Sequence, residues 1–263
     1  LFCPKEEKEV KKQKGIIIAL TMSIFAPFYI TVLVVCMVAL ITLFDFKMFP
    51  SLYRQKTFWY SFLFFLFSFT ISSVNQNHRG VWYSVLIFAI LLTGIYLQKT
   101  MQHSFFKEIL DIACICSIAC AGIAILQKYI YWDITPDYRP VSTFVNANYY
   151  ATMIEFIVLI AVYRLLTCPQ NRILYFITII FNLIGLYFAA SISSFLSLSC
   201  ALILFLFLWG KTKLSGFLFG GSVLFILAAI FIPQVFPRLS MAETSYGQRL
   251  EIWETAIRGL TDH

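Results

Sequence analysis

Long apolar runs separated by short polar gaps fill most of the chain. A helix that crosses the hydrocarbon core of a bilayer needs about 20 apolar residues, with a range of roughly 17–25. The clearest runs of that length are residues 58–74, 81–97, 109–126, 149–166 and 214–232. Residues 173–209 form a longer run, which the polar cluster of Ser191, Ser193 and Ser194 interrupts, so it predicts two further spans.

The first apolar run, residues 15–45, permits two interpretations because Pro27 interrupts it. It is too long for one upright helix and short for two complete crossings. Read as one span, it gives eight spans, with 11 cations inside and 9 outside; read as a hairpin turning near Pro27, it gives nine spans, with 14 inside and 6 outside. Because cytoplasmic loops are enriched in Lys and Arg, the second topology is favoured. We therefore expect nine spans, two of them short enough to thin the bilayer or to cross it only partly.

Composition supports the same fold class. Sixty per cent of the residues are apolar and 13% are charged, and Phe alone supplies 28 residues. A soluble protein of this size could not cover so much apolar surface with so few charges. The composition excludes a soluble enzyme, a disordered tail and a disulfide-stapled secreted domain. It predicts an all-α polytopic membrane protein.

The net charge of +7 does not form a patch suited to nucleic acid. Five lysines lie in residues 1–14, and most other cations lie in the gaps between apolar runs. This pattern predicts a basic cytoplasmic tail over residues 1–14, next to anionic membrane lipid, and no nucleic-acid partner. Cys114, Cys116 and Cys120 lack the spacing of a zinc site, so we interpret them as small packing residues and expect no metal site.

The predicted organisation is the tail, a helical bundle over residues 15–234, and the beginning of a large external loop over residues 235–263. A shorter external loop, residues 127–148, interrupts the bundle and contains Arg139. Asn146 or Asn148 is expected to cap the helix that follows it. A helix N-terminus beside an arginine favours binding of an anion. The alternative interpretation is an ordinary helix cap next to a surface arginine, which has the same sequence pattern.

The second external segment predicts an amphipathic helix on the membrane surface. Ser245 and Gln248 form a capping box at its start. Its apolar residues share one face and are Leu250, Trp253, Ala256, Ile257 and Leu260. Arg249 lies in the first turn, where the helix dipole disfavours a cation. A second arginine at a second external helix N-terminus strengthens the prediction of an anionic ligand.

These two segments resemble one family. The stretch RPVSTFVNAN, from Arg139 to Asn148, followed by a long span, is similar to the signature of the O-antigen ligase and O-antigen polymerase family. So is GQRLEIW, from Gly247 to Trp253, at the entry to an external amphipathic helix. The resemblance rests on their order, on their separation of about a hundred residues and on the predicted external position of both segments. It covers roughly residues 127–263.

The resemblance implies an inverting, metal-independent membrane glycosyltransferase of the GT-C type, with no cofactor. Such enzymes transfer a glycan from an undecaprenyl diphosphate carrier to a lipid, glycan or protein acceptor at the outer face of the cytoplasmic membrane. By position, Arg139 and Arg249 match the arginines that hold the diphosphate, and Asn146 and Asn148 match the family's asparagine pair. The N-terminus is then expected in the cytoplasm.

The chain also departs from the family pattern. Ala147 stands where a proline is common, and Ser193-Ser194 lacks the arginine that often follows such a serine. We assign no catalytic base, because His263 precedes the region where the family's histidine is expected. His78 and His103 have no motif support and are interpreted as solvent-facing or interfacial. We interpret the sequence as an excerpt of a longer protein, with the base beyond His263.

Two other interpretations remain open. Glu155 lies about two turns into a span and Asp111 near the start of another. Since intramembrane carboxylates are functional candidates, they favour a transporter or flippase for a lipid-linked or anionic substrate. Glu155 could equally face the cavity of a glycosyltransferase. A non-catalytic polytopic subunit is the third interpretation.

Overall fold

The chain is helical wherever the structure describes it. The computed structural model describes residues 4–44, 54–131, 138–231 and 250–258. The labelled helices are α1 (Pro4–Ile24), α2 (Phe28–Phe44), α4 (Lys56–Val74), α5 (His78–Thr100), α6 (His103–Ile130), α7 (Ala147–Thr167), α8 (Arg172–Ala189), α9 (Ile192–Leu208) and α10 (Thr212–Phe231). A further helix covers residues 250–258. No strand occurs among these residues.

Five helices, α4 to α8, are long and apolar enough to cross a membrane. The apolar helices α2 and α9 are shorter, with 17 residues each. These helices support the expected all-α, multi-pass membrane protein. The expected division of residues 173–209 is confirmed, because α8 ends at Ala189 and α9 begins at Ile192.

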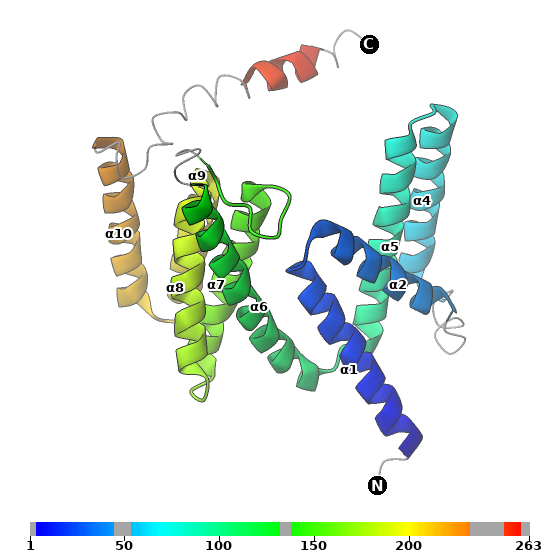
Figure 1. Cartoon of the computed structure of the whole chain (residues 1–263), viewed down its shortest axis with the longest axis horizontal. Helices are drawn as coiled ribbons and strands as arrows, with labels where there is room; N and C mark the ends of the chain where they lie inside the picture. The colour runs from blue at the N-terminus through cyan, green and yellow to red at the C-terminus, as the bar shows by residue number, and fades with distance from the viewer. Residues whose placement is uncertain (1–3, 45–53, 132–137, 232–249, 259–263) are drawn as a thin grey trace.

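The helices alternate in direction, so their connections gather at two ends of the bundle. Figure 1 shows the turn between α4 and α5, the loop between α6 and α7, and the turn between α8 and α9 at its upper end. The turns between α5 and α6, α7 and α8, and α9 and α10 lie at its lower end. The connections at the upper end are those predicted to be external, and the connections at the lower end are those predicted to be cytoplasmic.

The run of residues 15–45 is broken at Pro27, as the hairpin interpretation predicted. Helix α1 ends at Ile24 and α2 begins at Phe28. The Thr31 hydroxyl donates to the Ser23 carbonyl at 2.6 Å and ties the two helices together at the break. The basic tail is not a separate segment, because α1 begins at Pro4 and includes its lysines. Only the rest of α1, from Gly15 onward, is apolar.

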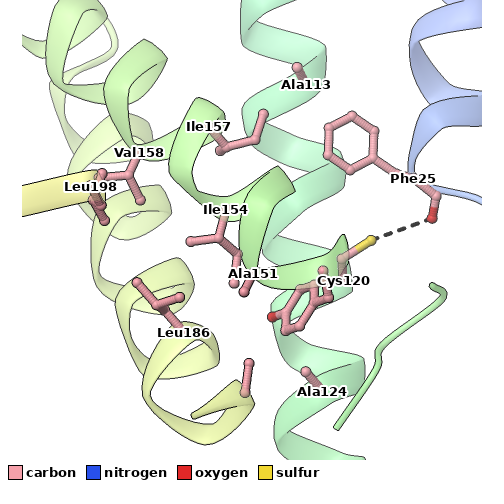
Figure 2. Close-up of a cluster of buried hydrophobic side chains, with 12 residues drawn as sticks. Phe25, Ala113, Cys120, Ala124, Ala151, Ile154, Ile157, Val158, Leu186 and Leu198 are labelled. Carbon is pink, nitrogen blue, oxygen red and sulfur yellow. Dashed lines mark hydrogen bonds between the residues drawn. The ribbon is translucent and has the colours of Figure 1, made fainter. Parts of the chain in front are cut away.

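The core lies where α6, α7 and α8 meet (Figure 2). Small side chains on α6, among them Cys120, Ala121 and Ala124, are fully or almost fully buried there. Small residues allow membrane helices to approach closely. Gly185 of α8 serves the same purpose, since a methyl group at that position would collide with the buried Tyr150 side chain of α7. Cys114 and Cys120 are buried packing residues, as expected.

A partly buried ion pair joins the same three helices nearer the lower end. The Arg164 guanidinium of α7 donates to both carboxylate oxygens of Asp111 on α6, with N–O distances of 2.8 and 3.0 Å from Nη2. The Tyr175 hydroxyl of α8 donates to the same carboxylate at 2.7 Å. Arg164 lies in the last turn of α7, with 6% of its side chain exposed. Asp111, one of the two carboxylates proposed for transport, is thus engaged in holding the bundle together.

Candidate functional site

The Gln127 side chain makes three of the hydrogen bonds that hold the described part of the loop between α6 and α7. Gln127, in the last turn of α6, accepts hydrogen bonds from the backbone N–H groups of Val141 and Ser142 at 3.1 and 2.8 Å. Its amide nitrogen donates to the Ser142 carbonyl at 2.9 Å. These bonds hold Ser142 at a φ of 54°, which L residues adopt only when their surroundings enforce it. The loop is also shorter than the predicted 127–148, because Gln127 belongs to α6 and Asn148 to α7.

The break between α1 and α2 supports this loop from the other side. The Phe25 carbonyl accepts a hydrogen bond from the Thr143 hydroxyl at 2.7 Å and one from the Cys120 thiol at 3.4 Å. Figure 2 shows the contact between Cys120 and Phe25 beside the core. The Ser142 hydroxyl donates to the Cys120 carbonyl at 2.7 Å. The loop is therefore attached to both α6 and the hairpin.

The two asparagines of the loop have different roles. Asn146 is the N-cap of α7: its backbone is extended, and its side chain accepts a hydrogen bond from the Asn148 N–H at 2.7 Å. Ala147 is the first residue of the helix, a position that favours proline but fits alanine. The turn therefore forms without the family's proline. Asn148, the other expected cap, binds Arg139 instead.

Arg139 joins the N-terminus of α7 to the C-terminus of α8. Its Nη2 donates to the Asn148 side-chain oxygen at 2.8 Å, and its Nε donates to the Ala189 carbonyl at 2.7 Å. Ala189 is the last residue of α8, and Ala190 after it adopts a left-handed φ of 47°. The guanidinium thus lies between the negative end of one helix dipole and the positive end of another. An anion placed there would be favoured by both the arginine and the N-terminus of α7.

A polar strip runs down α7 from this position. Asn148, Thr152 and Glu155 follow at the spacing of one helix face, and the Thr152 hydroxyl donates to the Asn148 carbonyl at 3.0 Å. Glu155 accepts a hydrogen bond from the Ser197 hydroxyl of α9. Glu155 is therefore placed in a polar contact between two helices, on the side of α7 that leads to Arg139.

Serines surround the start of α9. The Ser191 hydroxyl lies 3.1 Å from that of Ser194 and 3.3 Å from that of Ser193. Here the hydroxyls bond to one another, directly after the Ala189 carbonyl that receives Arg139.

Several predicted features lie outside the described residues. These are Arg249, Ser245, Gln248 and His263. The expected amphipathic helix is described over residues 250–258, all of them exposed, with an Arg258–Glu254 ion pair at 2.6 Å. His78 is exposed at the start of α5, as expected. The structure thus locates one of the two expected arginines, and the pairing of Arg139 with Arg249 stays a prediction.

Gln127 was not singled out by the sequence, although a glutamine in the last turn of a span is a signal for such a role. Within the described residues, no three His, Cys, Asp or Glu side chains form a group that could hold a metal ion. No protein-family model matches this chain, and no curated protein or solved structure matches it.

Replacing Gln127 with leucine should loosen the loop. The change leaves the N–H groups of Val141 and Ser142 without their acceptor. Each buried group left without a partner costs about 1–3 kcal/mol. We expect amide hydrogen exchange over residues 138–146 to become at least about tenfold faster, as measured by mass spectrometry. Leucine at the exposed Gln98 of α5 is the control, and equal exchange in the two variants would contradict the role of Gln127.

Proposed function

We propose that this chain belongs to a glycosyltransferase of the O-antigen ligase and polymerase type. It transfers a glycan from an undecaprenyl diphosphate carrier to an acceptor hydroxyl at the outer face of the cytoplasmic membrane. The observation that carries the proposal is the placement of Arg139 between Asn148 and the Ala189 carbonyl. It lies at the end of the bundle predicted to be external, in a loop fixed on two sides.

The proposed reaction is an inverting displacement at the anomeric carbon. The acceptor oxygen forms the new bond to that carbon while the bond to the diphosphate oxygen breaks. Negative charge develops on the departing diphosphate, and a guanidinium stays charged and binds phosphate oxygens in a bidentate manner. A cation and a helix N-terminus positioned in advance stabilise this charge without rearrangement. Because diphosphate is a good leaving group, the reaction requires no metal.

The remaining parts of the proposal follow from the sequence. The bundle crosses the membrane about nine times, with its N-terminus in the cytoplasm, and Arg249 supplies a second guanidinium at the same site. The acceptor hydroxyl also loses a proton, which requires a base. We assign no described residue to that role. The acceptor is a glycan, a lipid or a protein.

A transporter or flippase for a lipid-linked or anionic substrate is the second candidate. The contact between Glu155 and Ser197 favours it, because a carboxylate within a membrane bundle marks a path for ions or substrate in many transporters. An internal sequence repeat, the other common feature of transporters, is not evident in the sequence.

One comparison of variants separates these functions. Glycosyl transfer predicts that Arg139→Ala and Arg249→Ala each abolish transfer of a lipid-linked glycan, while the full-length protein still inserts. Transport predicts that Glu155→Gln abolishes movement of the lipid-linked substrate across vesicle membranes. Loss of translocation in Glu155→Gln, with normal transfer in both arginine variants, would refute the glycosyltransferase.

A further inference from the structure

A cavity of about 410 Å³ lies between α9 and α10. Its volume falls within the range of roughly 300–1,000 Å³ that is typical of ligand sites. Ile192, Phe195 and Ile203 line it on α9, and Phe217, Gly221 and Phe225 line it on α10. Apart from the hydroxyls of Ser199 and Ser222, its lining side chains are apolar. The cavity therefore suits a hydrocarbon ligand.

Two contacts hold α9 and α10 together at the ends of this cavity. The rings of Phe195 and Phe225 stack with centroids 5.4 Å apart. The Ser215 hydroxyl of α10 donates to the Ile203 carbonyl at 2.9 Å. Phe195 and Ile203 are eight residues apart, or about 12 Å along a helix. The cavity is thus an elongated slot that runs along the helices, as a lipid chain does.

The slot is open because α10 carries small residues beside it. A Cβ atom added at Gly221 would meet no heavy atom within 4 Å. The same holds for Gly220, which does not line the slot. A larger side chain at Gly221 would therefore enter the slot without displacing its walls, and it would not weaken the helix, since glycine is the poorest helix former after proline.

One end of the slot is close in sequence to the residue that binds Arg139. Ile192 lines the slot, and Ala189, three residues earlier, provides the carbonyl that binds the Arg139 Nε. Ala189 and Ile192 flank the turn between α8 and α9, so a lipid with its anionic headgroup at Arg139 would have the slot beginning at the same end of these helices.

We propose that the slot between α9 and α10 binds the first isoprene units of the lipid carrier while its diphosphate lies at Arg139. This inference rests on the proposed function and adds a binding site for the hydrocarbon part of the donor. A prenyl diphosphate carries a single chain, which one slot accommodates, whereas a phospholipid carries two chains joined close to the headgroup. The methyl branch of each isoprene unit also needs the width that Gly221 provides.

Photo-crosslinking tests the proposal. The probe is farnesyl diphosphate with a diazirine at the end of its chain remote from the diphosphate, added to the full-length protein in phosphatidylcholine nanodiscs. We expect mass spectrometry to find labels on the slot residues of α9 and α10. Gly221→Phe should lower that labelling by about tenfold or more, because several carbons of the chain lose their contacts. Gly220→Phe, the matched control, should leave it unchanged.

Competition and an arginine variant complete the experiment. Excess undecaprenyl diphosphate should suppress the labelling, and excess phosphatidylglycerol should not. Labelling spread over all helices, equal effects of the two glycine variants, or equal competition by phosphatidylglycerol would each overturn the proposal. Labelling of the slot that persists in Arg139→Ala would keep the slot but refute the diphosphate site. Loss of transfer in Arg139→Ala with normal labelling in Gly221→Phe would support the diphosphate site but refute the slot as the site of the lipid chain.

Discussion

Replacing Arg139 with alanine is expected to lower the rate of glycan transfer from a lipid diphosphate by about 100- to 1,000-fold. That is the usual effect of removing one preorganised group that stabilises charge in a transition state. The change removes the guanidinium from its position between Asn148 and the Ala189 carbonyl. The measurement is transfer of a radiolabelled lipid-linked glycan by membranes that contain the full-length protein.

The chain offers a matched control for this experiment. Arg79 lies in the first turn of α5, a helix that also has an asparagine N-cap and begins at the same end of the bundle. Arg79→Ala should leave transfer unchanged, and Arg139→Lys should retain part of it, because lysine keeps the charge but not the fork of donors. Because Arg139 also links α7 to α8, membrane insertion and thermal stability of the Arg139 variants must be compared with those of the unmodified protein. Transfer at the normal rate in a stable Arg139→Ala protein would refute the diphosphate site.

Replacing Arg164 with alanine is expected to destabilise the bundle by about 3–5 kcal/mol, the usual cost of leaving one member of a buried ion pair alone. Arg164 makes a bidentate contact with Asp111, and the Tyr175 hydroxyl completes the group. Without Arg164, the carboxylate of Asp111 would be left among α6, α7 and α8 with only the Tyr175 hydroxyl. The measurement is thermal unfolding of the purified protein in detergent.

Two controls show whether the pair itself carries this effect. Arg172→Ala, at the exposed first residue of α8, should change stability little. The double variant Asp111→Leu and Arg164→Leu should recover most of the loss, because no charge is then left without its partner. Equal stability of Arg164→Ala and the unmodified protein would show that Asp111 does not depend on the ion pair.

Features encoded by neighbouring residues were predictable from the sequence. The break at Pro27 and the division at Ala190–Ser191 follow from helix-breaking and polar residues inside apolar runs. The cap of α7 was narrowed to Asn146 or Asn148, because both have the required side chain. Only the backbone decides between them: Asn146 is extended, whereas Asn148 is already helical. Short-range signals thus predicted these helix boundaries and narrowed the cap of α7 to two residues.

Contacts between distant residues were not predictable in this way. Arg164 and its partner Asp111 are 53 residues apart in the sequence. Both lie two residues from the ends of the predicted spans 109–126 and 149–166, so their opposite charges at matching depths would have suggested the pair. The Ala189 carbonyl that binds Arg139 has no sequence signal, because every residue carries such a group.

The contact between Phe25 and Thr143 has a consequence for biosynthesis. The two residues are 118 positions apart, so the loop that contains Arg139 acquires this support only after the ribosome has delivered all of the intervening helices. Helices α1 and α2 are therefore synthesised well before the loop that they contact. Deleting this hairpin would therefore impair the assembly of a distant loop, even though no residue of the hairpin is proposed to touch the substrate.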